Sequence, residues 1–180
     1  NYLRREHSKR GGAYIHRNAS VFGVPENLVA PLDWIMKSHN LSVSELEANL
    51  RIPFAADDRV LDVRQLAAIL CTADAIEFSD TRVLDGVVEI ARQTGGGAAV
   101  ISYRENRKHD CIRDSLAVTA DGQVVVSGTF DDGDVLALAH RTFDEMEGWI
   151  RGYCDIDRQS KTPRLKIRPE PFLRRLALPG

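Results

Sequence analysis

The spacing of apolar positions predicts consecutive helices over the first half of the chain. Apolar residues there recur every three or four positions, which is the period of one helix face. Helices are predicted over residues 2–22, 25–39, 61–76 and 81–93, with a short one opened by Ser42. The pattern over 61–76 is the strongest, and its expected buried stripe is Leu66, Ile69, Leu70 and Ala73.

Residues that begin or end helices bound these segments. Pro25 suits a first helical turn, because its missing N–H is one that a helix leaves without an internal partner. Ser42 and Glu45 form a capping-box pattern, in which each side chain bonds the backbone N–H of the other. Pro53 limits the short helix, and we expect a loop from there to Asp58.

The second half of the chain changes to a strand-like pattern. Asp121-Gly122 is a two-residue hairpin signal between apolar segments at 116–120 and 123–129. Further strands are expected at 98–103 and 165–167. After Asp134 the spacing is helical again, through Ile150 to an end near residue 153 or 157.

These elements predict an α+β protein in two parts. Residues 1–93 form a mainly α-helical bundle, and residues 95–180 form a small α/β unit with a β-hairpin, one long helix and a basic C-terminal linker. With 180 residues, of which 43% are hydrophobic, the chain can bury a substantial core.

Net charge and cysteine content indicate which partners and which cellular location to expect. The net charge is −2, which gives no general attraction for nucleic acid or for an anionic membrane. No apolar run approaches the roughly 20 residues of a membrane helix. The three cysteines have no zinc-type spacing, which favours reduced thiols. We therefore expect a cytoplasmic protein with no membrane partner.

Three predicted helices each carry a metal-ligand type of residue on their apolar stripe. His7, His39 and Asp74 each follow an apolar residue of the stripe by four positions, and we expect all three to point inward. A buried carboxylate is costly unless it is paired, hydrogen-bonded or bound to a cation. Two imidazoles and one carboxylate suit a transition-metal or magnesium site in a helical bundle.

Structural roles are the alternative for the same residues. A histidine on an apolar face is more often a hydrogen-bonded core residue than a ligand. Asp74 would be equally satisfied by an ion pair with Arg82 or by capping a neighbouring helix. The combination of the three is what favours a metal site.

Three segments carry these residues in a fixed order: Glu6 to Gly11, Lys37 to Asn40, and Leu70 to Arg82. In that order they resemble the later half of HD-superfamily metal-dependent phosphohydrolase domains. The resemblance covers roughly residues 3–93, and Ala73-Asp74 with the following Arg82 is its most specific part. The likeness is greatest to HD domains found beside GHKL-type chaperone ATPase domains in bacterial multidomain proteins.

The resemblance implies a set of site residues. Asp74 would be the terminal metal-binding aspartate, and His7 and His39 would be outer ligands or contacts to substrate phosphate. Arg82 and Lys37 are candidate phosphate clamps. The implied cofactor is a divalent metal, which is Mn, Mg, Fe or Zn.

The defining His-Asp doublet of such domains should precede His7. The chain opens at Asn1 without a methionine and inside a predicted helix, so we expect further sequence upstream. His109-Asp110 spells the doublet, but it follows Asp74 in the chain and we interpret that match as chance.

The sequence therefore favours a metal-dependent phosphohydrolase-like domain that acts on a nucleotide or related phosphate ester. Two alternatives stay open. One is a catalytically degenerate HD module that binds a nucleotide or regulates an adjoining ATPase domain. The other is a helical interaction domain in which His7, His39 and Asp74 are structural.

Overall fold

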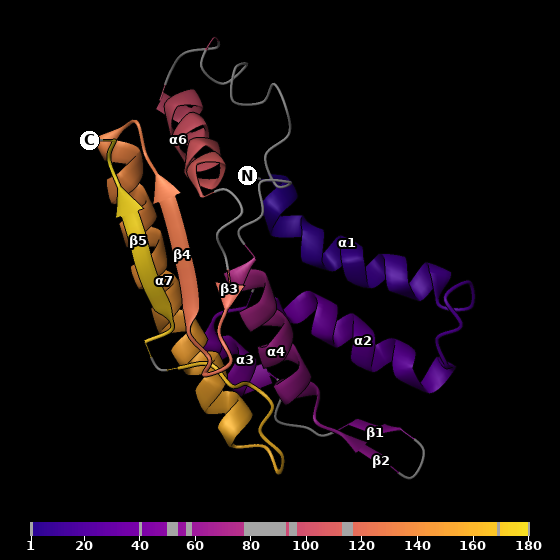
Figure 1. Ribbon diagram of the computed structural model, residues 1–180. Helices are drawn as coiled ribbons and strands as arrows, with labels where there is room; N and C mark the ends of the chain where they lie inside the picture. The colour runs from indigo at the N-terminus through magenta and orange to yellow at the C-terminus, as the bar shows by residue number, and fades with distance from the viewer. Residues whose placement is uncertain are drawn as a thin grey trace. The chain divides into compact units, whose positions relative to one another are not determined.

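The computed structural model describes residues 2–39, 41–49, 54–56, 59–77, 93, 97–112, 117–168 and 170–179. In chain order its elements are α1 (Tyr2–Asn18), α2 (Glu26–Ser38), α3 (Val43–Asn49), β1 (Phe54–Ala56), β2 (Arg59–Leu61), α4 (Val63–Ile76), α6 (Gly97–Cys111), β3 (Ala117–Val118), β4 (Val124–Thr129), α7 (Gly133–Arg158) and β5 (Phe172–Ala177). Figure 1 shows them along the chain. The protein is mainly helical with a small sheet, so the predicted α+β class is confirmed.

The chain forms two compact units. The first comprises residues 1–74 and 149–165, and the second comprises residues 75–148 and 166–180. Helix α7 therefore supplies its C-terminal part to the first unit and its N-terminal part to the second. The predicted boundary between residues 93 and 95 stays a prediction, because residues 94–96 lie outside the described ranges.

Several local signals are confirmed. Ser42 and Glu45 form the capping box that opens α3: the Ser42 N–H donates to Glu45 Oε2 at 2.8 Å, and the Glu45 N–H donates to Ser42 Oγ at 3.3 Å. Asp121 and Gly122 lie in the turn between β3 and β4, and Gly122 has φ +83°. That backbone conformation favours glycine, which explains the hairpin signal.

Two strand predictions and one loop prediction are wrong. Residues 98–103 belong to α6 instead of a strand. The expected loop before residue 58 contains β1, which pairs with β2 in antiparallel register. Residues 165–167 are not a strand; β5 follows them and pairs in parallel with β4. The helix predicted over 81–93 lies outside the described residues except for Gln93.

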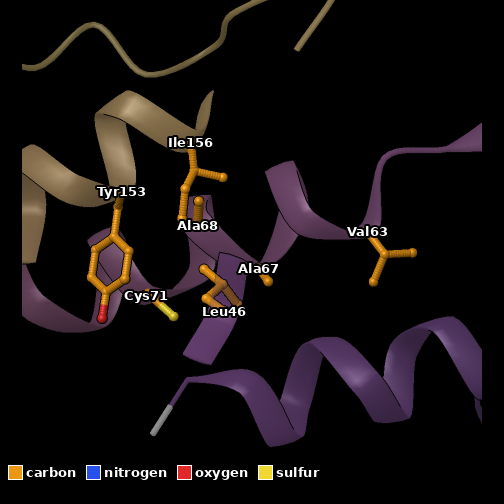
Figure 2. Close-up of a cluster of buried hydrophobic side chains, with 7 residues drawn as sticks. All are labelled: Leu46, Val63, Ala67, Ala68, Cys71, Tyr153 and Ile156. Atoms are coloured by element: carbon orange, nitrogen blue, oxygen red, sulfur yellow. The ribbon is translucent and has the colours of Figure 1, made fainter. Parts of the chain in front are cut away.

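The core of the first unit joins α3, α4 and α7, and Figure 2 shows its side chains. Its buried members are Leu46, Val63, Ala67, Ala68, Cys71, Tyr153 and Ile156. On α4 the buried face is therefore lined largely by small residues, which let neighbouring helices approach closely. The predicted stripe is wrong in phase: Leu66 is 41% exposed and Ala73 is exposed, because packing selected the small side chains over the large ones.

A fully buried carboxylate fixes the segment that follows α7 in the first unit. Asp157 accepts hydrogen bonds from Gln65 Nε2 at 2.7 Å, from the Arg164 N–H at 2.8 Å and from the Leu165 N–H at 2.8 Å. Because these donors satisfy both oxygens, the charge is tolerated inside the protein. The backbone N–H groups of Arg164 and Leu165 thus bond a side chain instead of a neighbouring strand.

The second unit is built around a sheet of order β3-β4-β5. Helix α7 connects the parallel strands β4 and β5 and lies behind them in Figure 1. Phe143 of α7 packs on Phe172 of β5, with ring centroids 4.9 Å apart. The Arg174 guanidinium covers the Phe143 ring and pairs with Glu147 at 2.7 Å. This arrangement confirms the predicted α/β unit with a hairpin and one long helix.

Replacement of Asp157 by alanine tests its role in the first unit. We expect Asp157→Ala to lower the free energy of unfolding by roughly 3 kcal/mol, because buried donors lose their acceptor. Asp155→Ala is the matched control, since Asp155 is exposed on the same helical turn, and it should change stability by less than about 0.5 kcal/mol. Chemical denaturation measures both, and equal effects would contradict the assignment.

Candidate functional site

His39 lies at the C-terminal end of α2 and is half-buried. Its Nδ1 lies 2.7 Å from the backbone oxygen of Met36, at hydrogen-bond distance. A carbonyl only accepts, so Nδ1 carries the proton in the neutral ring and Nε2 carries the lone pair. This tautomer is the one that metal-binding histidines commonly adopt.

Asp74 lies near the C-terminal end of α4, and its side chain is exposed. The expectation that it points inward is therefore wrong. The buried face of α4 is the one that carries the small side chains, and Asp74 lies outside that face. Its charge still acts on two buried neighbours. Burial is the main cause of the raised pKa of Cys71 and of Tyr153, and the Asp74 carboxylate raises both further.

The predicted metal ligands lie only in part within the described residues. His7 lies on α1, but its side chain is outside the description, and Arg82 lies outside the described residues altogether. Within the described ranges no group of three or more His, Cys, Asp or Glu side chains is arranged to hold a metal ion. Among the expected ligands, His39 has described contacts that fit metal binding, because its Nδ1 lies at hydrogen-bond distance from the Met36 carbonyl.

His109 and Asp110, which spell the doublet, lie near the end of α6. Both are half-buried, and the Asp110 carboxylate pairs with Arg107 one turn earlier on the helix. Arg107 also binds Asp131, at 2.7 Å. Asp110 therefore has a structural role in the second unit.

The first unit contains a charged cluster that sequence analysis named only in part. Lys37 Nζ donates to Oδ2 of Asp33 at 2.6 Å, one turn apart on α2. His16 Nε2 of α1 lies 3.7 Å from the same oxygen. Asp33 is 8% exposed, whereas the side chains of Lys37 and His16 are about half exposed. A buried carboxylate thus binds the partly exposed Lys37 ammonium group and lies near the partly exposed His16 ring.

Glycines on α1 make room for this cluster. Helices α1 and α2 lie side by side in Figure 1. A Cβ atom on Gly12 would lie 2.1 Å from Asp33 Oδ1, and one on Gly11 would lie 2.9 Å from the terminal methyl of Met36. Only glycine permits so close a contact at residue 12, because any side chain there would overlap the carboxylate.

The two oxygens of Asp33 have different environments. Oδ2 faces Lys37 and His16, while Oδ1 is buried against Gly12 and has no hydrogen-bond partner among the described residues. A buried charged oxygen without a hydrogen bond is energetically costly. The attraction of Lys37 and, when protonated, of His16 offsets that cost.

The sequence analysis missed three residues of this cluster because their local signals are common. They are Asp33, Gly12 and His16. Asp33 and Lys37 are an i,i+4 pair, which is usually an exposed ion pair on a helix. Two consecutive glycines inside a predicted helix were a detectable sign of close helix packing. The sequence did not show which residue of α2 the glycines would face.

Comparison with known proteins assigns the class. The match is to an HD-type domain. Within that class the chain belongs to the HD-CE family, whose model matches residues 1–155. The matched range is longer than the residues 3–93 that carried the resemblance, and it includes α6, the β3–β4 hairpin and most of α7. No curated protein and no solved structure matches the chain.

Among the described residues, no helix combines the length and the apolar character that crossing a membrane requires.

Gly12→Ala tests the close contact of α1 with α2. We expect the added methyl group to displace Asp33 and to lower the free energy of unfolding by about 1–3 kcal/mol. Gly148→Ala on α7 is the control, because a Cβ there meets nothing within 4 Å. It should stabilise the protein by about 0.5–1 kcal/mol through helix propensity alone. If both changes stabilise the protein in thermal unfolding, the contact is not formed.

The thiol of Cys71 gives a pH dependence with a defined sign. Burial raises its pKa from 9.0 to about 11, so the folded state keeps the proton over a range in which the unfolded chain loses it. The contribution of the thiol to stability is therefore fully present below pH 9. It is lost between pH 9 and 11, by roughly 1.4 kcal/mol per pH unit.

Cys71→Ala removes this contribution. Between pH 9 and 10.5 the unfolding free energy of the variant should fall by roughly 2 kcal/mol less than that of the parent chain. Urea unfolding at each pH measures this difference. Parallel losses in the two proteins would show that the thiol titrates normally.

Proposed function

We propose that the chain is the HD-type module of a metal-dependent phosphohydrolase that acts on a nucleotide or related phosphate ester. The observation that carries the proposal is its membership of the HD-CE family over residues 1–155. Fold class alone does not fix an activity, so the proposal depends on residues that can be tested. A cytoplasmic location is part of the same proposal.

In this proposal His39 contributes Nε2 to the metal, since its Nδ1 is directed to the Met36 carbonyl. Asp74 contributes a solvent-accessible carboxylate, and His7 is the third proposed ligand. A divalent metal bound there would polarise a phosphoryl oxygen and lower the pKa of a bound water.

Lys37 and Arg82 are the proposed phosphate contacts. The pairing with Asp33 supports this role for Lys37, because it holds the ammonium group in place while the side chain is still 45% exposed. A substrate phosphate would therefore meet a positioned cation rather than a freely moving one.

A second function is favoured by two observations. Asp74 is exposed, and no metal-binding group is assembled among the described residues. A degenerate HD module that binds a nucleotide without hydrolysing it, or that regulates an adjoining ATPase domain, would need no complete metal centre. Metal content and turnover distinguish the two functions.

The test is elemental analysis of the full-length protein, combined with hydrolysis assays on a nucleotide panel with added manganese. We expect bound metal and turnover, and we expect Asp74→Ala to abolish both. Asp155→Ala, which removes another exposed helical carboxylate of the first unit, should change neither.

Nucleotide binding without metal or turnover would favour the degenerate module and would exclude the hydrolase. Unchanged metal content in Asp74→Ala would show that Asp74 is not a ligand.

A further inference from the structure

The cluster of His16, Asp33 and Lys37 presents two nitrogen groups at one point of the first unit. Both lie near the same oxygen of Asp33, at 2.6 and 3.7 Å. The oxygens of a single phosphate group can contact two donors placed so close together. Both donor side chains are partly exposed, so an anion can reach them from solvent.

The charge of the surrounding segment favours an anion over a cation. Residues 2–38 contain six Lys and Arg against three Asp and Glu, although the whole chain has a net charge of −2. Lys9 lies seven positions before His16, hence on nearly the same face of α1, and it is exposed. Local positive charge attracts phosphate.

The burial of Asp33 supports a positioning role for this residue. The Asp33 carboxylate is 8% exposed, and its Oδ1 has no partner within the described part of the chain. Its burial therefore costs more desolvation free energy than an exposed i,i+4 ion pair does. This arrangement restricts Lys37 beside the His16 ring before any ligand arrives. Such preorganisation reduces the entropy lost on binding.

We propose that His16 and Lys37, positioned by Asp33, form a binding site for a phosphate group on the α1–α2 pair. The ligand class is a phosphate monoester or free phosphate, and binding needs no metal. The proposal deepens the proposed function and rests on it only for the identity of the phosphate as part of a nucleotide or related ester.

Binding is measured by calorimetry on the full chain in the presence of EDTA, with inorganic phosphate and AMP as probes. Lys37→Gln and His16→Gln should each weaken binding about ten-fold, the usual effect of losing one charge-assisted hydrogen bond. Arg17→Gln is the matched control, because it removes one positive charge from the residue next to His16. It should weaken binding less than two-fold.

The NMR signal of the His16 imidazole gives a direct readout and should shift on addition of phosphate. Asp33→Asn, with folding checked by circular dichroism, should weaken phosphate binding and reduce this shift. Tighter binding of AMP than of phosphate would identify a nucleotide as the source of the group.

Absence of phosphate binding would overturn the proposal, and so would equal weakening by Arg17→Gln and Lys37→Gln, which would indicate unspecific attraction. Because EDTA removes metal ions, these results are independent of hydrolysis. Failure of this site and failure of the metal-dependent activity are thus distinguishable.

Discussion

The buried carboxylate of Asp33 constrains the packing of the α1–α2 pair. It is held by Lys37 on its own helix and by His16 on the other, and it occupies space that a side chain at Gly12 would fill. Charge burial is tolerated in proteins when a partner is fixed nearby. The close packing of the two helices therefore depends on one glycine and one ion pair, and the placement of both nitrogen groups follows from it.

Elements set by local chemistry were predicted well from the sequence. The capping box of Ser42 and Glu45 and the turn at Gly122 involve residues close in the chain, so their signals can be recognised in isolation. Strand β5 and helix α6 depend on distant partners. The segment that became α6 contains Val100 and Ile101, which favour strands locally, but the sequence did not show what would pack on it.

The candidate site was predicted less completely, again for physical reasons. Periodicity identifies residues that share a helix face, but it does not fix which face is buried when small side chains pack more closely than large ones. Asp74 followed Leu66 and Leu70 in the predicted stripe, and the structure buries Ala67 and Cys71 instead. The importance of Asp33 follows from a contact between two helices, so no pattern within α2 would have revealed it.

The central claim is that the buried Asp33 carboxylate positions Lys37 and does not form an ordinary surface ion pair with it. A double-mutant cycle of Asp33→Asn and Lys37→Met, measured by denaturant unfolding, tests it most directly. We predict a coupling energy above about 1 kcal/mol, because the shared oxygen is removed from water. A coupling of about 0.5 kcal/mol or less, the usual value for an exposed i,i+4 pair, would contradict the account.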